Sequence, residues 1–545
     1  MKTNLSFLRS TTRIFFLATA TLLLLSARSM TFAGSATWLA APATGNWTTN
    51  ANWTPNTGYP GIIGTTDVAT FATSNTTSVH IATLNSPEVA EIIFNSGASA
   101  FTITVDGLAA SLGIFGTGIT NSSGITQNFV TAEKGGTISF NNSATVTNTA
   151  GSVTTFTNNG STASGDIGGE TDFLDASNAG SATITNNGGT VSGAFGGITQ
   201  FQGTSNAGSA TLIAKGGTAS GAGGGSIQFF ASSTGGTASV DVRNDGSGAA
   251  GNLDISARIG GVTIGSLEGS GNVFLGARNL TVGNNLSKTF SGVIQDGGVG
   301  LGTGGSLIKT GTGALTLTGA NTYTGGTTVN AGSLFVNNTG GLSGTGTGAV
   351  TVSGGTLGGG NGTAIASTIS GTVTVSSGAN LAPGATGNGS TGILNIGALT
   401  LNSGANFSID LNGPLAGTNY DQVEVTHPVF INGSNLVLNS VSGLSVGEQL
   451  FIVDNDGGQA VFGTFAGLAE GATFSSGGDT FTISYIANDG DGGALGPAVP
   501  GNDIELTVDS VRPVPEPSTW VGGALAFAAV AYTQRRRFSQ MLRRA

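Results

Sequence analysis

Four acidic residues lie close together in the chain and have the chemistry of a hydrolytic site: Asp166, Glu170, Asp172 and Asp175. Glycosidases act through a pair of carboxyl groups, and polysaccharide lyases need a basic residue beside a cation site. Gln200 and Gly203 stand 28 residues after Asp172 and Asp175, so the cluster breaks a local repeat and could mark a site. An acidic loop on a repetitive surface is more often only solvated, and we favour that interpretation.

Two short segments are rich in oxygen ligands: Asp454-Asn455-Asp456-Gly457 and Asp489-Gly490-Asp491-Gly492. Ca²⁺ takes about six to eight oxygen ligands, but neither segment completes an EF-hand loop. Asp, Asn and Gly also favour tight turns, because their side chains or backbone accept turn geometry. We therefore favour structural turns, with Ca²⁺ as the alternative, and expect no other cofactor.

The sequence contains few of the residues that nucleophilic or metal-dependent hydrolysis requires. His80 and His427 are its two histidines, about 350 residues apart, and it contains no cysteine. The motifs H-E-x-x-H and G-x-x-x-x-G-K-[ST] are absent from the sequence. We expect no catalytic residues and predict that the protein is not an enzyme.

Aromatic residues gather near the N-terminal end of the body, at Trp38, Trp47, Trp53 and Tyr59. If exposed, they could stack on sugar rings; if buried, they would plug the open end of a repeat array. We favour the buried cap.

The composition favours a folded, repetitive β structure. The 545 residues include 95 glycines and 8% charged residues, yet 38% are hydrophobic, which a disordered Gly/Ser linker would lack. The formal net charge of −11 would repel nucleic acid, so we expect no nucleic-acid partner.

A repeat sets the organisation of the body. Similar segments at Asn158–Gly165, Asn186–Gly193 and Ala214–Gly221 follow one another every 28 residues, and Phe173, Phe201 and Phe229 keep the same phase. Periods of this size are typical of solenoids. Short alternating stretches broken by Asn-Gly and Gly-Gly predict three strands and three turns per copy, which is one coil of a parallel β-helix.

A second pattern runs from Leu307 to Leu334, where the sequence reads L-x-K-x-G-x-G-x-L-x-L-x-G-x-N-x-Y-x-G-G-T-x-V-x-x-G-x-L. The alternation predicts half-buried strands whose inward residues include Leu315 and Leu317. Asn321 is predicted to fill a turn, with its amide bonded to the backbone of the next coil.

This stretch resembles the autotransporter-associated β-strand repeat of bacterial surface proteins. The resemblance implies a β-helix passenger on the cell surface and supplies no catalytic residue. The chain ends without the amphipathic strands of a transmembrane barrel, so we expect a different export route.

The two ends of the chain have the character of targeting segments. Basic residues precede the apolar run Ile14–Leu25, which predicts a signal peptide cleaved near Ala33. At the other end, the C-terminal segment resembles the PEP-CTERM sorting tail, with an apolar helix between its two motifs: Pro515, Glu516 and Pro517 first, then Arg535, Arg536 and Arg537. The apolar part would span about 21 Å against a bilayer core of about 30 Å, so we expect a short transmembrane helix that anchors only transiently. The resemblance implies processing by an exosortase, a membrane-embedded enzyme.

We predict an all-β, elongated parallel β-helix between an N-terminal signal helix and the C-terminal helix. The expected segments are the signal peptide (1–33), the N-terminal cap and first strands (34–130), the 28-residue repeats (131–266), the autotransporter-associated repeat region (267–400), a C-terminal β domain (401–510) and the sorting tail (513–538). The expected function is structural or adhesive, at the cell surface or outside the cell, in association with exopolysaccharide, after a transient stay at the inner membrane. The alternatives are a carbohydrate-active enzyme and an ice-binding protein.

Overall fold

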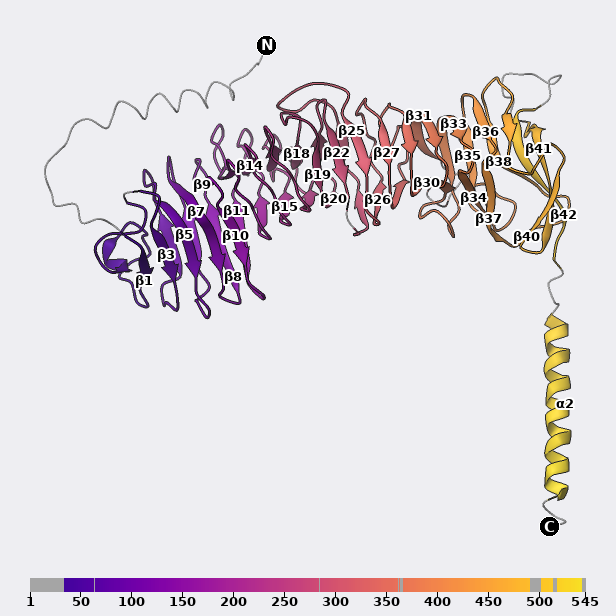
Figure 1. Ribbon diagram of the computed structural model, residues 1–545, viewed down its shortest axis with the longest axis horizontal. Helices are drawn as coiled ribbons and strands as arrows, with labels where there is room; N and C mark the ends of the chain where they lie inside the picture. Colours follow the sequence, from indigo (N-terminus) through magenta and orange to yellow (C-terminus); the bar gives the residue numbers. More distant parts are fainter. Residues whose placement is uncertain are drawn as a thin grey trace.

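The computed structural model describes residues 34–512, apart from residues 63, 284, 361, 363–365 and 491–500, and the backbone of residues 517–541. Over these ranges the body winds into an elongated solenoid, coloured from indigo to orange in Figure 1. The prediction of an all-β parallel β-helix is confirmed. The predicted signal helix and Ala33 lie outside the described residues.

Three sheets run along the described solenoid, and most neighbouring strands in them are parallel. Sheet A contains β1 (Ala36–Trp38), β2 (Trp53–Thr54), β3 (Val68–Phe71), β5 (Glu88–Phe94), β7 (Ser111–Asn121), β9 (Thr137–Phe140), β10 (Thr145–Asn148), β12 (Glu170–Phe173), β14 (Ile198–Phe201), β16 (Ser226–Phe229), β18 (Asn252–Asp254), β21 (Asn272–Phe274) and β24 (Val293–Gln295). Sheet B contains β4 (Ser78–Ile81), β6 (Thr102–Val105), β8 (Thr126–Thr131), β11 (Val153–Asn158), β13 (Thr183–Asn186), β15 (Thr211–Ala214), β17 (Ser239–Val242), β20 (Ser266–Gly269), β23 (Lys288–Phe290), β26 (Ala314–Leu317), β28 (Ser333–Val336), β30 (Thr356–Gly359), β32 (Asn380–Pro383), β34 (Asn406–Leu411) and β37 (Asn435–Val441). Sheet C contains β19 (Val262–Ile264), β22 (Asn279–Val282), β25 (Ser306–Lys309), β27 (Thr327–Val329), β29 (Val350–Val352), β31 (Ser367–Val375), β33 (Ile393–Leu401), β35 (Gln422–Val425), β36 (Val429–Asn432), β38 (Gln449–Asn455), β39 (Phe462–Thr464), β40 (Thr473–Ser476), β41 (Asp479–Ala487) and β42 (Asp503–Ser510). A short 3-10 helix, η1, spans Asn50–Asn52.

The 28-residue period is the length of one coil. Phe173 pairs in register with Phe201, and Phe201 with Phe229, on three successive strands of sheet A. Their buried rings stack in parallel, with centroids 5.0 Å and 4.8 Å apart. The predicted phase of these phenylalanines is therefore confirmed.

The prediction of three strands per coil is wrong for the 28-residue repeats, which have two strands and a single bridging residue. Asn178 bridges to Asn206, and Asn206 to Thr234, in place of the third strand. The Asn178 side chain explains why no strand forms, because its Oδ1 accepts the N–H of Gly180 at 2.7 Å and turns the chain at once.

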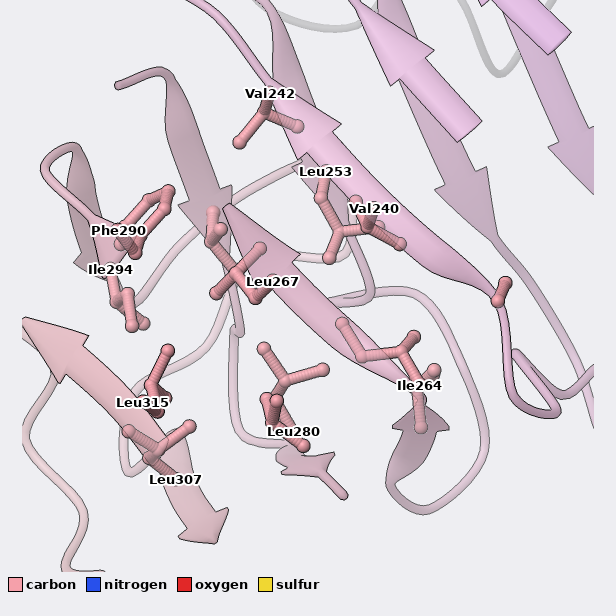
Figure 2. Packing of buried hydrophobic residues seen from close by; sticks show 14 of the residues in the cluster. Val240, Val242, Leu253, Ile264, Leu267, Leu280, Phe290, Ile294, Leu307 and Leu315 are labelled. Atoms are coloured by element: carbon pink, nitrogen blue, oxygen red, sulfur yellow. The ribbon is translucent and has the colours of Figure 1, made fainter. Parts of the chain in front are cut away.

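Sheet C replaces sheet A along the solenoid, so the interior is rebuilt at the point of exchange. Sheet A ends at β24, whereas sheet C begins at β19, and sheet B continues beside both. Figure 2 shows the shared interior there, where Leu253 of β18, Leu267 of β20 and Leu280 of β22 gather. Each of these side chains is fully buried, so the apolar core passes through the exchange without a break.

The pattern predicted for Leu307–Leu334 is confirmed in its strands and in its turn. Leu315 and Leu317 are buried, and Thr316 between them faces outward. The buried Asn321 accepts the N–H of Ile294 from the preceding coil at 2.7 Å and donates to the carbonyl of Gly344 in the next coil at 2.5 Å. One side chain thus joins three successive coils.

Both ends of the described solenoid are closed by antiparallel strands. At the N-terminal end, β1 pairs with β2 over three buried indoles, Trp38, Trp47 and Trp53, and Trp38 and Trp47 each lie with their centroid 5.0 Å from that of Trp53. The prediction of a buried cap is confirmed, and the sugar-stacking alternative is wrong for the indoles because they are not exposed. Tyr59 is partly buried against the same core. At the other end, β38, β42, β41 and β40 form an antiparallel cap.

A helix, α2, spans Pro517–Met541. Arg535, Arg536 and Arg537 lie in it and are exposed, and Pro517 is its first residue, whereas Pro515 and Glu516 lie outside the described residues. No helix in the described part of the chain is long and apolar enough to cross a membrane. The prediction of a transmembrane helix is therefore not supported.

Candidate functional site

Glycine-rich hairpins project from the solenoid between sheet B and sheet A; we call residues 159–168, 187–196 and 215–224 the glycine fin. In the middle hairpin, Gly197 donates its N–H to the carbonyl of Asn187 and closes the base, while the tip around Val191 is exposed. Successive hairpins are bonded to each other, for example from Gly189 N–H to Gly223 O at 2.8 Å.

Glycine is required where the hairpins stack. A Cβ atom on Gly188 would lie 2.2 Å from the carbonyl oxygen of Gly216 in the next hairpin, which is closer than atoms can approach. The fin therefore depends on the Asn-Gly and Gly-Gly pairs that the sequence repeats every coil, and these pairs build a wall rather than only tight turns.

The fin produces a groove on each of its sides. The first groove, of about 540 Å³, follows the strand ends of sheet B and is lined by a row of polar residues that repeats with each coil, Asn159, Asn187 and Lys215. The second, of about 400 Å³, lies over sheet A from β14 to β21. We call this second one the sheet-A groove.

The floor of the sheet-A groove belongs to a polar row on the outer face of sheet A. In register, Asp172 pairs with Gln200, Gln200 with Gln228, Gln228 with Asp254, and Asp254 with Phe274. Neighbouring strands lie about 4.8 Å apart, so the row presents one side chain per coil at that spacing.

The structure divides the predicted acidic cluster. Glu170 and Asp172 lie together on β12, on the outer face of sheet A, and continue the polar row of the groove. Asp166 lies in the fin, and Asp175 lies on the turn after β12, where its carboxylate accepts the N–H of Asn142 at 2.9 Å. The cluster therefore contributes one carboxyl pair, not four converging groups.

The carboxyl pair is electrostatically strained. Burial, followed by the neighbouring charge of Glu170, raises the pKa of Asp172 well above its ordinary value of 3.8. Asp172 Oδ1 is buried without a hydrogen-bond partner, and Gln200 donates from Nε2 to Glu170 Oε1 at 2.5 Å. A raised carboxyl pKa of this kind occurs in acid–base sites and also in structural carboxyl pairs.

We expect Asp172→Asn to stabilise the protein relative to wild type increasingly as the pH rises. Since folding raises this pKa, the carboxyl group stabilises the fold fully below about pH 4, and the contribution is lost as the pH rises through the raised value. The measurement is the difference in Tm between variant and wild type from pH 5 to pH 8. Ser139→Ala, which changes an uncharged neighbour of Asp172, is the control; a constant difference for Asp172→Asn would contradict the expectation.

The floor of the groove is organised by hydrogen bonds among its own side chains. Gln228 donates from Nε2 to Ser226 Oγ at 3.0 Å, and that hydroxyl donates to Asn252 Oδ1 at 2.7 Å. At the far end, the buried Asp254 accepts the N–H of Val299 at 2.8 Å and holds the loop before β25 against the sheet. The groove is therefore walled at both its side and its end.

The structure also brings Ser78, His80 and Asp106 together, which the sequence patterns did not predict. His80 Nε2 lies 3.1 Å from Ser78 Oγ, and its Nδ1 lies 3.5 Å from Asp106 Oδ2. The order matches a serine hydrolase triad, but the His80 and Asp106 side chains are 41% and 42% exposed, and the N–H of His80 is bonded to Gly45 O. A catalytic triad works in a site that excludes water and offers free N–H donors to the oxyanion. We therefore interpret the contacts of Ser78, His80 and Asp106 as surface contacts. His427 instead contacts Thr426 and Gly397 O.

Three carboxylates meet near the C-terminal cap: Asp454, Asp489 and Asp503 each offer an oxygen atom within 4.8 Å of the others. Two of them come from the predicted oxygen-rich segments, and Asp503 of β42 was not predicted. Asp503 accepts the N–H groups of Asn455 at 2.9 Å and of Asp489 at 3.0 Å, so it ties the two segments together. Residues 491 and 492 lie outside the described residues.

This carboxylate cluster has the donor set for a cation. Burial is the main cause that raises the pKa of Asp503, and the charges of Asp489 and Asp456 add to it. Asn455 Oδ1 accepts the N–H of Gly457 at 3.1 Å, which is the turn geometry that the sequence favoured. The structural turn is confirmed for this segment, and Ca²⁺ at the two oxygen-rich segments stays the alternative.

The fold defines the class of the protein, the parallel β-solenoids. The comparison with protein families matches only a short part of the chain. The model of the passenger-associated-transport-repeat matches residues 307–335, which confirms the predicted resemblance to the autotransporter-type repeat in that segment. No curated protein matches the chain. The repeat and the solenoid are consistent with an exported, surface-displayed structural protein.

The structure shows what the lysine of the matched repeat contacts. Lys309 is buried, and its Nζ donates to the carbonyls of Thr310 at 2.5 Å, Gly311 at 3.1 Å and Ala331 at 3.4 Å. Burial lowers the pKa of Lys309. The lysine of the motif therefore joins the turns of two successive coils through these hydrogen bonds.

Proposed function

We propose that the chain is an exported surface protein whose solenoid has a structural or adhesive role in the extracellular matrix, in association with exopolysaccharide. The observation that supports this proposal most is the combination of an elongated parallel solenoid with a passenger-type repeat. Contacts would be weak and numerous along the solenoid faces, so binding would depend on many coils together.

The proposal includes the sorting route. The tail with Pro515, Glu516, Pro517 and Arg535–Arg537 would be read at the inner membrane by an exosortase-type enzyme, which cuts near the Pro-Glu-Pro motif. The start of α2 at Pro517 is compatible with this, because proline suits the first helical position.

Deletion of residues 514–545 in the native host is expected to abolish the normal processing and surface location of the protein. Fractionation of cells and medium, with an antibody against the solenoid, measures both. The control is the triple variant Arg535→Lys, Arg536→Lys and Arg537→Lys, which keeps the positive charge and should sort normally. Unchanged processing and location after the deletion would contradict the sorting proposal.

A carbohydrate-active enzyme is the second candidate, and the carboxyl pair of Glu170 and Asp172 is the observation that favours it. Release of reducing ends from the polysaccharide by wild type, lost in Asp172→Asn, would replace the adhesive proposal. An ice-binding face receives less support, because the outward Thr-x-Thr pattern on β11 and β13 gives way to Thr211-Leu212-Ile213 on β15.

A further inference from the structure

We propose that the sheet-A groove is a binding site for an uncharged polysaccharide chain, which lies across β14, β16, β18 and β21 against the glycine fin. This inference rests on the proposed function and gives it a place and a ligand class.

The shape of the groove fits an extended chain. Its side wall is the fin, its floor is the outer face of sheet A, and its end wall is the loop held by Asp254. The volume of about 400 Å³ is enough for a few sugar units, since ligand sites in proteins start at about 300 Å³. The groove crosses successive coils from β14 to β21, so a polymer lying along it would meet one side chain of the row at each coil.

The chemistry of the lining suits sugars, which combine apolar ring faces with hydroxyl groups. Phe195, on the fin, leaves 54% of its surface exposed beside the groove, and Phe274 lies on the floor at the far end. Between them, Gln228, Ser226 and Asn252 provide amide and hydroxyl groups already held in place by their mutual hydrogen bonds. Aromatic faces with fixed polar groups are an ordinary solution for small polar ligands.

The charge of the groove selects against anionic ligands. The lining holds the carboxylate of Asp254 and no lysine or arginine. Glu170 and Asp172 continue the same row, so an acidic polysaccharide or a phosphate would meet only negative charge. Sheet A also offers no free backbone edge to a peptide here, because β14, β16 and β18 are already paired on both sides. An uncharged polysaccharide is the occupant that both charge and shape allow.

The test uses the full chain and the polysaccharide shed by the native host, separated into neutral and acidic fractions. Phe195→Ala and Gln228→Ala are expected to weaken binding of the neutral fraction about tenfold, measured by affinity electrophoresis or calorimetry. Two matched controls should bind as wild type does: Phe462→Ala, which removes an exposed phenylalanine of sheet C, and Val191→Ala, at the exposed tip of the fin. Both changed groove residues have outward-facing side chains, so the variants should keep the circular dichroism and Tm of wild type.

Each other outcome has a definite meaning. If wild type binds the neutral fraction and both groove variants bind equally well, the groove proposal is wrong and the adhesive function stands. Preference for the acidic fraction would overturn the ligand class and the groove with it. If wild type binds neither fraction, the association with exopolysaccharide fails, and the groove proposal fails with it.

Discussion

Phe201→Ala should lower the free energy of unfolding by about 3–5 kcal/mol. The ring of Phe201 is fully buried and stacks between Phe173 and Phe229, with centroids 5.0 Å and 4.8 Å away. The coils above and below are held by continuous parallel pairing, so they cannot close the cavity left by the ring. Chemical denaturation followed by circular dichroism measures the loss.

Phe195→Ala is the matched control for this prediction. Phe195 lies on the fin of the same coil and is largely exposed, so its removal should change the free energy of unfolding by less than about 0.5 kcal/mol. Equal losses for Phe195→Ala and Phe201→Ala would mean that the stacked rings do not carry the stability of these coils.

Asn321→Leu should cost about 2–4 kcal/mol, the second largest effect. Leucine has nearly the same volume but leaves the N–H of Ile294 without its acceptor and the carbonyl of Gly344 without its donor. Both groups are buried between coils, so water cannot replace the amide. Limited proteolysis should also cut earlier in the coils on either side, because three coils lose their shared contact.

Asn330→Leu controls for the loss of an amide in the same region, since Asn330 is exposed. It should leave the free energy of unfolding within about 0.5 kcal/mol of wild type. If Asn321→Leu were as mild, the asparagine of the repeat motif would have a role other than joining coils.

The period and the inward residues could be predicted from the sequence because each depends on short-range pattern. Phe173, Phe201 and Phe229 recur at the coil length, and only register pairing satisfies that recurrence. Asn321 could be predicted as well, since a buried asparagine in a turn has few partners other than the backbone of adjacent coils.

The candidate site could be predicted only in part, because it is assembled by contacts between coils. Glu170 and Asp172 share a face since they alternate on one strand, but Asp166 and Asp175 are near them only in sequence. The groove wall depends on backbone hydrogen bonds between hairpins, such as the bond from Gly189 N–H to Gly223 O. Backbone bonds of this kind cannot be predicted from the residue types.

Contacts between residues far apart in the sequence could not be predicted, for the same reason. Asp503 joins Asp454 and Asp489 because β42 returns antiparallel to β38, and the length of that return is not a sequence pattern. Ser78, His80 and Asp106 meet because β4 and the end of β6 are adjacent in sheet B.

The antiparallel caps at the two ends decide how such a molecule can join a larger assembly. A parallel coil left open would offer its backbone edge to another copy and let copies add end to end without limit. The pairing of β1 with β2 and of β38 with β42 covers the ends of sheets A and C in the described solenoid, whereas sheet B ends at β4 and β37 without such a strand. We therefore expect the proposed contacts with a matrix to use the faces and the fin more than the ends of the solenoid.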